Sequence, residues 1–219
     1  MNKIDGLKFI KYYFPEITIN SYFVETINVD TKAELMRIRN SPEKFWRVRS
    51  ACKTGKELKL PMGSFYNETD AIDFITRQYK KNGNLSFVLH CIDNTYYYPE
   101  FTGTLAVYND GDFSTIVIEL QKTPKELIDN MDLGIRPRDW PVCVNIQYQF
   151  LHKYPKVRIF DDVNFELLKR PVSMLYNVGC QIYAIYEDKE WHTTSYTRFN
   201  IYKDGSIIMN DHRTIESFI

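Results

Sequence analysis

Two β-type runs joined by a tight turn constrain the fold of this chain more than any other feature. The runs span residues 101–108 and 113–120, and the sequence Asn-Asp-Gly-Asp at 109–112 separates them. This turn chemistry is typical of a β-hairpin, which pairs its two strands antiparallel. We therefore predict a sheet that is built at least in part from antiparallel strands.

Further strand and helix patterns follow one another without regular alternation. The clearest helix pattern starts at the capping residues 67–69, carries apolar residues at helical spacing, and ends at Gly83. Because a doubly wound fold would alternate strands and helices, this order predicts an α+β protein with mixed or antiparallel sheets and flanking helices. The other predicted helices span residues 31–38, 123–131 and 164–176, and the other predicted strands span residues 21–27, 45–49, 86–92, 143–149, 157–160, 180–186, 197–202 and 206–209.

The charge balance argues against one class of partner. The chain has 28 basic and 28 acidic residues, so no net field attracts polyanions, and we do not expect a nucleic-acid partner. Tyr96, Tyr97 and Tyr98 offer stacking groups for single-stranded nucleic acid, but consecutive strand side chains alternate between faces and cannot all contact one ligand.

The sequence also bears on cellular location and domain organisation. Residues 1–17 contain no uninterrupted apolar core of a secretory leader, and no later stretch approaches the roughly 20 apolar residues of a membrane span. The four cysteines are widely separated, which is typical of free thiols in a reducing compartment. We expect a cytoplasmic protein without a membrane partner. We predict one compact domain over residues 1–219, with a division into two lobes near residues 82–86 as the alternative.

Common catalytic and metal-binding motifs are absent. The sequence has neither the P-loop nor the glycine-rich dinucleotide fingerprint, and none of its four histidines lies in a nucleophile-elbow context. His90 beside Cys91 is the one neighbouring His–Cys pair, and adjacent strand residues point to opposite faces, which argues against zinc. Arg47 and Arg49 alternate along a strand and precede a basic loop, so they could bind phosphates or belong to a solvated basic surface.

Several short motifs, taken in order, resemble one known family. The segments RSACKTGKEL (49–58), MGSFYN (62–67), FVLHCID (87–93) and FTGTLAVY (101–108) are followed by a long run at 118–140 and by KDGSIIMNDHRTI (203–215). In this order they resemble the ATP-grasp nucleotide-binding domain of phosphoenolpyruvate synthase and pyruvate phosphate dikinase. The resemblance spans nearly the whole chain and implies a two-lobed ATP-grasp-like architecture.

The resemblance also implies a ligand and site residues. It predicts ATP and Mg²⁺ as cofactors, with Arg49 and Arg213 contacting phosphates and Arg213 acting in catalysis. The segment from His90 to Asp93 would line the adenine site. Glu119 would lie near the ribose or the metal, and Asp211 would take the place of a metal-binding glutamine.

Some positions depart from the family pattern. Where the family places acidic metal ligands on its closing strands, residues 197–200 are Thr, Arg, Phe and Asn, and phosphoryl transfer needs a divalent metal held by acidic ligands. Glu187, Asp188 or Glu190 is the alternative source of that ligand. The family's Gly-Gly-Lys start and its phosphohistidine and pyruvate-binding domains are also missing, so we do not expect a complete synthase or dikinase.

Three functions therefore remain open. The chain is an ATP-dependent phosphotransferase, a pseudoenzyme of the same fold that senses a nucleotide or binds a protein partner, or an unrelated α+β interaction protein. Individual residues also have structural alternatives: Arg213 could pair with Glu216, Asp211 could cap a turn, and His90 could be a core histidine. Glu119 is harder to explain structurally, because a lone carboxylate is costly to bury in an apolar strand.

Overall fold

The chain divides into two compact units, which are described separately. The computed structural model describes residues 1–28, 45–54, 60–92, 99–109, 114–123, 144–149, 156–159 and 165–217. Unit 1 comprises Met1–Tyr97 with Glu216–Ile219, and unit 2 comprises Tyr98–Ile215. No helix within the described ranges is long and apolar enough to cross a membrane.

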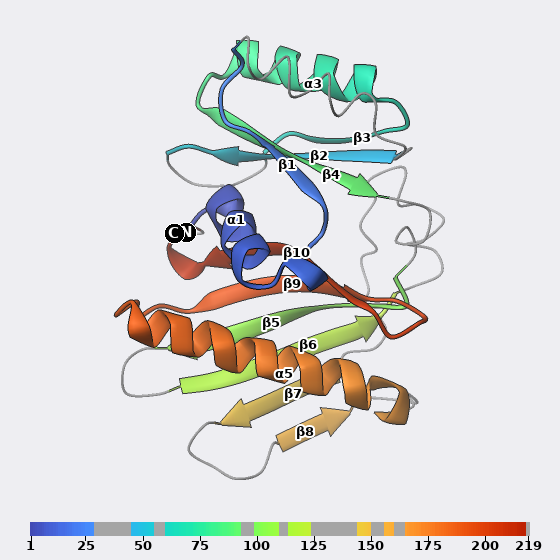
Figure 1. Ribbon diagram of the computed structural model, residues 1–219, viewed down its shortest axis with the longest axis vertical. Helices are drawn as coiled ribbons and strands as arrows, with labels where there is room; N and C mark the ends of the chain where they lie inside the picture. The colour runs from blue at the N-terminus through green and yellow to red at the C-terminus, as the bar shows by residue number, and fades with distance from the viewer. Residues whose placement is uncertain are drawn as a thin grey trace. The chain divides into compact units, whose positions relative to one another are not determined.

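Unit 1 is built on an antiparallel sheet with the strand order β1-β4-β2-β3 (Figure 1). Its strands span Ser21–Val24 (β1), Phe45–Cys52 (β2), Met62–Phe65 (β3) and Leu85–Ile92 (β4). The helix predicted after residues 67–69 is α3 (Glu68–Lys81), and Asn67 caps it by accepting a hydrogen bond from the backbone N–H of Asp70 at 2.8 Å.

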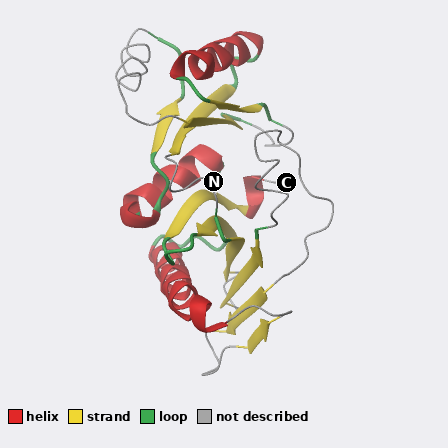
Figure 2. Ribbon diagram, turned by 90° about the vertical axis from the view of Figure 1, so that its right-hand side faces the viewer, coloured by secondary structure: helices red, strands yellow, loops and turns green. Residues whose placement is uncertain are grey.

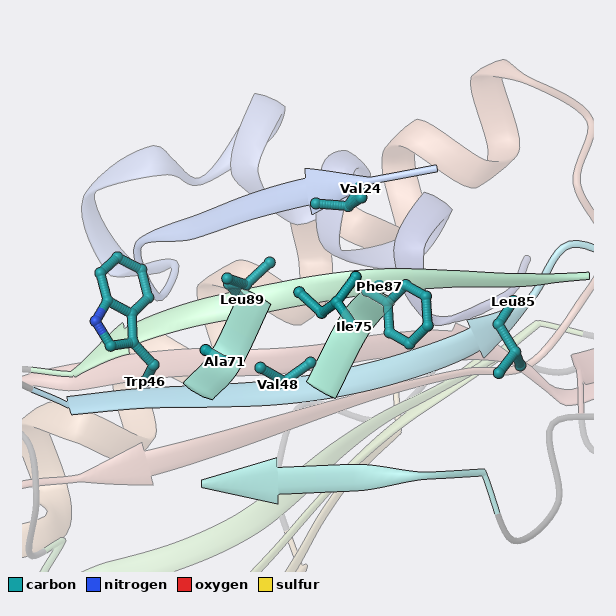
Figure 3. Close-up of a cluster of buried hydrophobic side chains, with 8 residues drawn as sticks. All are labelled: Val24, Trp46, Val48, Ala71, Ile75, Leu85, Phe87 and Leu89. Carbon is teal, nitrogen blue, oxygen red and sulfur yellow. The ribbon is translucent and has the colours of Figure 1, made fainter. Parts of the chain in front are cut away.

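The core of unit 1 lies between α3 and this sheet. Ala71 and Ile75 of α3 are fully buried, and Figure 3 shows them over the strands. The sheet contributes the remaining members of the cluster: Val24, Trp46, Val48, Leu85, Phe87 and Leu89. Because strand side chains alternate between faces, the buried positions of β2 force Arg47 and Arg49 onto the opposite face, as the sequence predicted.

Helix α1 (Lys3–Tyr13) was not predicted from the sequence. Asn2 caps it through Oδ1, which accepts hydrogen bonds from the backbone N–H groups of Ile4 and Asp5, both at 3.0 Å. Ile4, Leu7 and Ile10 follow one stripe of the helix and are buried. A short 3₁₀ turn, Pro15–Ile17, follows. The edge strand β3 was also missed.

Unit 2 is built on a second antiparallel sheet with the strand order β10-β9-β5-β6-β7-β8. The predicted hairpin is β5 and β6, which pair from Phe101 opposite Lys122 to Asn109 opposite Ser114. The strands span Phe101–Asn109 (β5), Ser114–Lys122 (β6), Val144–Gln149 (β7), Lys156–Ile159 (β8), Ser195–Ile201 (β9) and Ile207–Thr214 (β10). The two antiparallel sheets with flanking helices confirm the predicted α+β class.

A single long helix, α5 (Phe165–Asp188), covers one face of this sheet (Figures 1 and 2). The strand predicted at 180–186 is therefore wrong, because that segment continues the helix. Leu175, Val178 and Ile182 recur at helical spacing and are buried. Gly179 lets the helix approach the sheet closely, since a Cβ there would lie 2.9 Å from Ile116 Cδ1.

The remaining predictions fall on turns and on residues outside the described ranges. In the predicted turn between β9 and β10, Gly205 has a φ of 80°, and Asp204 accepts a hydrogen bond from the backbone N–H of Ser206 at 2.9 Å. The predicted helix at 31–38, the predicted helix at 123–131 apart from its first residue, Thr123, and the loop residues 110–112 lie outside the described ranges.

Candidate functional site

The face of the unit 2 sheet that points away from α5 carries a cluster of polar residues, and we call it the polar face. Residues directly opposite each other on neighbouring strands share a face. Glu119 on β6 lies opposite Thr104 on β5, Thr104 lies opposite Arg198 on β9, and Arg198 lies opposite Asp211 on β10. These four residues, which we call the polar row, cross the sheet in one line.

The two faces of the sheet differ because one is packed beneath α5. Leu105 and Ile118 lie on the α5 side and are fully buried, whereas Glu119 and Arg198 are exposed. Glu119 therefore carries no burial penalty, which removes the difficulty that its apolar strand suggested.

A β-bulge in β10 decides which of its residues reach the polar face. The pairing runs from Met209 opposite Phe199 directly to Asp211 opposite Arg198, so the residue between them, Asn210, is extra. In a regular strand with Asn210 paired, Asp211 would lie two positions after Met209 and would share its face, which is buried on the α5 side. The bulge therefore moves Asp211 and Arg213 to the polar face.

Asp211 and Arg213 form a two-pronged ion pair. Arg213 Nε donates to Asp211 Oδ1 at 3.2 Å, and Nη2 donates to Oδ2 at 2.8 Å. The side chain of Asp211 is 3% exposed and that of Arg213 is 12% exposed. This fork geometry is the strong form of a charge-assisted contact, and it engages both oxygens of the carboxylate.

His212 lies between these two residues in sequence but points to the opposite face. Its Nε2 is 2.9 Å from Tyr186 Oη of α5, and its Nδ1 is 2.7 Å from Thr197 Oγ1 of β9. Burial lowers the pKa of His212 to about 3, although Asp211 acts in the other direction. A neutral imidazole therefore ties β10 to α5 and β9 and has a structural role.

An aromatic pair lies on the polar face beside the polar row. Tyr108 of β5 and Tyr196 of β9 have ring centroids 6.3 Å apart in an edge-on arrangement. Burial raises the pKa of Tyr108, with further contributions from Tyr196 and Glu119. The sequence analysis did not select either tyrosine, since the strand pairing that joins them is not visible in a linear sequence.

Unit 1 holds two more of the predicted site residues on one face of its sheet. Arg49 lies opposite Val88, and Arg47 lies opposite His90. His90 is 1% exposed, and its Nδ1 is 3.0 Å from Ser21 Oγ. These contacts favour the core-histidine interpretation for the His90 side chain. The predicted role of its backbone stays a prediction.

The structure thus gathers three of the six predicted site residues on the polar face of unit 2: Glu119, Asp211 and Arg213. Arg49 and His90 share a face of the unit 1 sheet, and Asp93 lies outside the described residues. Arg198, which the sequence analysis noted as a departure from the family pattern, stands directly opposite Asp211.

The described residues do not fit the Mg²⁺ that the resemblance implies. They contain no group of three His, Cys, Asp or Glu side chains placed to hold a metal ion. Both oxygens of Asp211 are bound to Arg213. Among the alternative ligands, Glu187 accepts a hydrogen bond from Asn109 Nδ2 at 2.7 Å, and Asn109 lies on the α5 side of the sheet.

Comparison with known proteins gives structural matches only. No protein-family model matches the sequence, and no curated protein matches it. D-alanyl-alanine synthetase A from Vibrio cholerae aligns with a TM-score of 0.52 at 9% identity, over 94% of this chain and 52% of that chain. N5-carboxyaminoimidazole ribonucleotide synthetase, solved as its ADP complex, aligns with a TM-score of 0.51 at 11% identity, over 95% of this chain and 44% of that chain.

A third solved structure, D-cycloserine synthetase DcsG, has a TM-score of 0.50 at 11% identity and covers 95% of this chain and 61% of that chain. The chain spans 52% of the first of these synthetases, about half of its length. Because the sequence identities are this low, the matches bear on the fold alone. The matched synthetases have the ATP-grasp fold. This chain, with its two antiparallel sheets and flanking helices, has the same fold.

Proposed function

We propose that this chain is an ATP-binding domain. The observation that carries the proposal is the ATP-grasp fold, which 95% of the chain shares with a synthetase solved with bound ADP. The polar face supports it, because it brings a guanidinium and an exposed carboxylate onto one surface. The finer resemblance, to the phosphoenolpyruvate synthase and dikinase type, is part of this proposal.

The residues of the polar face suit different parts of the nucleotide. Arg213 has guanidinium N–H groups besides the two that donate to Asp211, and a guanidinium is well suited to phosphate oxygens. Glu119 offers a carboxylate that accepts hydrogen bonds from ribose hydroxyls. The predicted contacts of Arg49 with phosphate and of the segment from His90 to Asp93 with adenine concern unit 1 and stay predictions.

We further propose that binding, rather than phosphoryl transfer, is the function of this domain. Transfer requires a divalent metal held by acidic ligands, and Asp211 is already bound to a guanidinium. A nucleotide-sensing module that acts through a protein partner fits this arrangement. The second candidate, a phosphotransferase, predicts release of ADP or transfer of phosphate in an assay with radiolabelled ATP.

A thermal-shift titration with ATP and ADP tests the binding proposal. A ligand present at 100 times its dissociation constant stabilises a protein by about 2.7 kcal/mol. For a chain of this size, that corresponds to a rise in melting temperature of about 5–10 °C. The absence of any shift at millimolar nucleotide would overturn the proposal.

Substitution of Glu119 locates the site. The Glu119→Gln variant removes one charged hydrogen-bond acceptor, so we expect an affinity for ATP that is lower by about tenfold or more. Asp73→Asn is the matched control, because Asp73 is an exposed carboxylate on α3 that has no role in the proposed site. Equal losses in both variants, or none in Glu119→Gln, would place the nucleotide elsewhere.

A further inference from the structure

We propose that the guanidinium of Arg213 takes the place of the divalent metal, so that this chain binds nucleoside polyphosphates without Mg²⁺. The inference rests on the proposed function, because it concerns the same site on the polar face. It goes further by naming the group that neutralises the phosphates and by removing Mg²⁺ from the binding reaction.

The Asp211 carboxylate is already engaged by Arg213. Its two oxygens accept hydrogen bonds from Nε and Nη2 of Arg213, at 3.2 and 2.8 Å. The pair is largely shielded from water, with side chains 3% and 12% exposed. Separating such a pair leaves a charge in a poorly solvated place, which is costly. A metal ion would therefore have to displace a partner that is already well placed.

Two arginines place positive charge around that carboxylate. Arg198 lies directly opposite Asp211 in the ladder, and opposite residues have Cβ atoms about 4.5–5.5 Å apart. Asp211 therefore has one arginine across the ladder and another two positions along its own strand. A divalent cation at its oxygens would face repulsion from both, whereas a polyphosphate would be attracted by both.

The other carboxylate of the polar row lies too far from Asp211 to share a metal ion with it. Mg²⁺ requires oxygen ligands at 2.0–2.1 Å in an octahedral arrangement. The other carboxylate of the polar row, Glu119, lies three strands away from Asp211, with Arg198 and Thr104 between them. Three strand spacings separate the two backbones by about 14 Å. The two carboxylates cannot share one ion across this distance.

The bulge in β10 fixes Arg213 on the polar face. The extra residue Asn210 moves both Asp211 and Arg213 to the polar face. Asp211 then orients the guanidinium plane through two hydrogen bonds. An arginine held in this way is preorganised for phosphate oxygens, and less conformational entropy is lost when a nucleotide binds.

Calorimetric titration of the full chain with ATP, in EDTA and in excess MgCl₂, tests the inference. We expect the two dissociation constants to agree within about threefold. Affinity that is at least tenfold higher with Mg²⁺ would overturn the inference and leave the proposed function intact. Absence of binding in both buffers would overturn the proposed function, and the inference with it.

Variants of Arg213 give a second readout. In EDTA, Arg213→Gln should bind ATP about tenfold or more weakly, because it loses a charged donor. Arg213→Lys keeps the charge without the fork and should show an intermediate loss. Arg170→Gln, an exposed arginine on α5, is the matched control and should bind like the wild type. Wild-type affinity in both Arg213 variants would overturn the inference.

A metal titration without nucleotide completes the test and does not depend on the folding of any Arg213 variant. Electron paramagnetic resonance of Mn²⁺ reports binding of the ion directly. We expect the wild-type chain to leave Mn²⁺ free in solution. Binding of Mn²⁺ by the wild type, abolished in Asp211→Asn, would show that the carboxylate is a metal ligand after all.

Discussion

Asp211 and His212 are neighbours in the chain, but they lie on opposite faces of the unit 2 sheet and serve different purposes. Asp211 holds Arg213 on the polar face. His212 lies beneath α5, fully buried between two hydroxyl groups. A change at either position should therefore have a distinct signature: under the proposed function a change at Asp211 alters nucleotide binding, whereas a change at His212 alters stability.

The free energy of unfolding should depend on pH because His212 is buried in the neutral form. An unfolded histidine has a pKa near 6.5, and burial lowers it to about 3 in the folded chain. Below pH 6.5 the unfolded chain binds a proton that the folded chain does not, so stability is full above pH 6.5 and falls toward pH 3. When the pH is lowered from 7 to 5, the free energy of unfolding therefore falls by about 2 kcal/mol.

Urea unfolding at a series of pH values checks this expectation. His212→Gln should be less stable than the wild type at pH 7, because its contacts are altered, but its stability should fall less steeply toward pH 5. The exposed His192 provides the control, and His192→Gln should keep the wild-type pH dependence. Parallel pH profiles for the wild type and His212→Gln would contradict the assignment of a buried neutral imidazole.

Sequence reasoning reached some of these residues and missed how they are arranged. Arg213, Asp211 and Glu119 were selected through short motifs. Their common face was not predictable, because it depends on a bulge that changes the alternation of side chains after Met209. Beyond the bulge, Asp211 and Arg213 are two apart on a regular strand and therefore share a face, which allows them to pair.

At the scale of the elements, β5 leaves room for only a glycine at position 103, because the backbone of β6 and the ring of Phe199 lie close to it. Gly103 lies opposite both Leu120 and Phe199. A Cβ at this position would overlap the carbonyl oxygen of Glu119 and would lie 2.6 Å from Phe199 Cζ. Glycine is thus required by the space available, and any side chain must push the strands apart.

Gly103→Ala should therefore lower the free energy of unfolding by about 1–3 kcal/mol through overpacking. Chemical denaturation followed by circular dichroism measures this change. Gly83→Ala is a suitable control, because a Cβ there would meet nothing within 4 Å. That variant should be as stable as the wild type, or more stable by about 0.4–1 kcal/mol, because alanine reduces the conformational entropy of the unfolded chain. Equal effects at both glycines would refute the steric argument.

Most elements with strong local signals were predicted, whereas α5, which depends on tertiary contacts, was predicted only in its first half. The cap and spacing of α3 and the β5–β6 hairpin are encoded within short segments. The second half of α5 has strand-favouring residues such as Ile182 and Tyr183, yet it is helical because its buried stripe packs on the sheet. Helix α1 had a readable signal, Asn2 followed by Ile4 and Leu7, that the sequence analysis did not use.

At the scale of the whole molecule, the order of several weak motifs predicted the correct fold. Each motif was short, but together they followed the sequence of an ATP-grasp domain, and solved synthetases of that fold align with 94–95% of the chain. Order along a chain reflects topology, which survives when individual side chains change. The role of a single site residue, such as the predicted role of Asp211 as a metal ligand, does not follow from that order, because it depends on one side chain.

Each unit has its own buried core, which predicts two separable responses to core substitutions. Ile75 is fully buried between α3 and the unit 1 sheet, and Leu105 is fully buried beneath α5 in unit 2. Truncation of either residue to alanine leaves a cavity and should cost about 2–5 kcal/mol. Because protection from hydrogen exchange reports local stability, Ile75→Ala should accelerate exchange in β2 and β4, and Leu105→Ala should accelerate it in β5 and β9. If either variant accelerated exchange equally in both sheets, the units would unfold as one, and the two cores would act as a single cooperative structure.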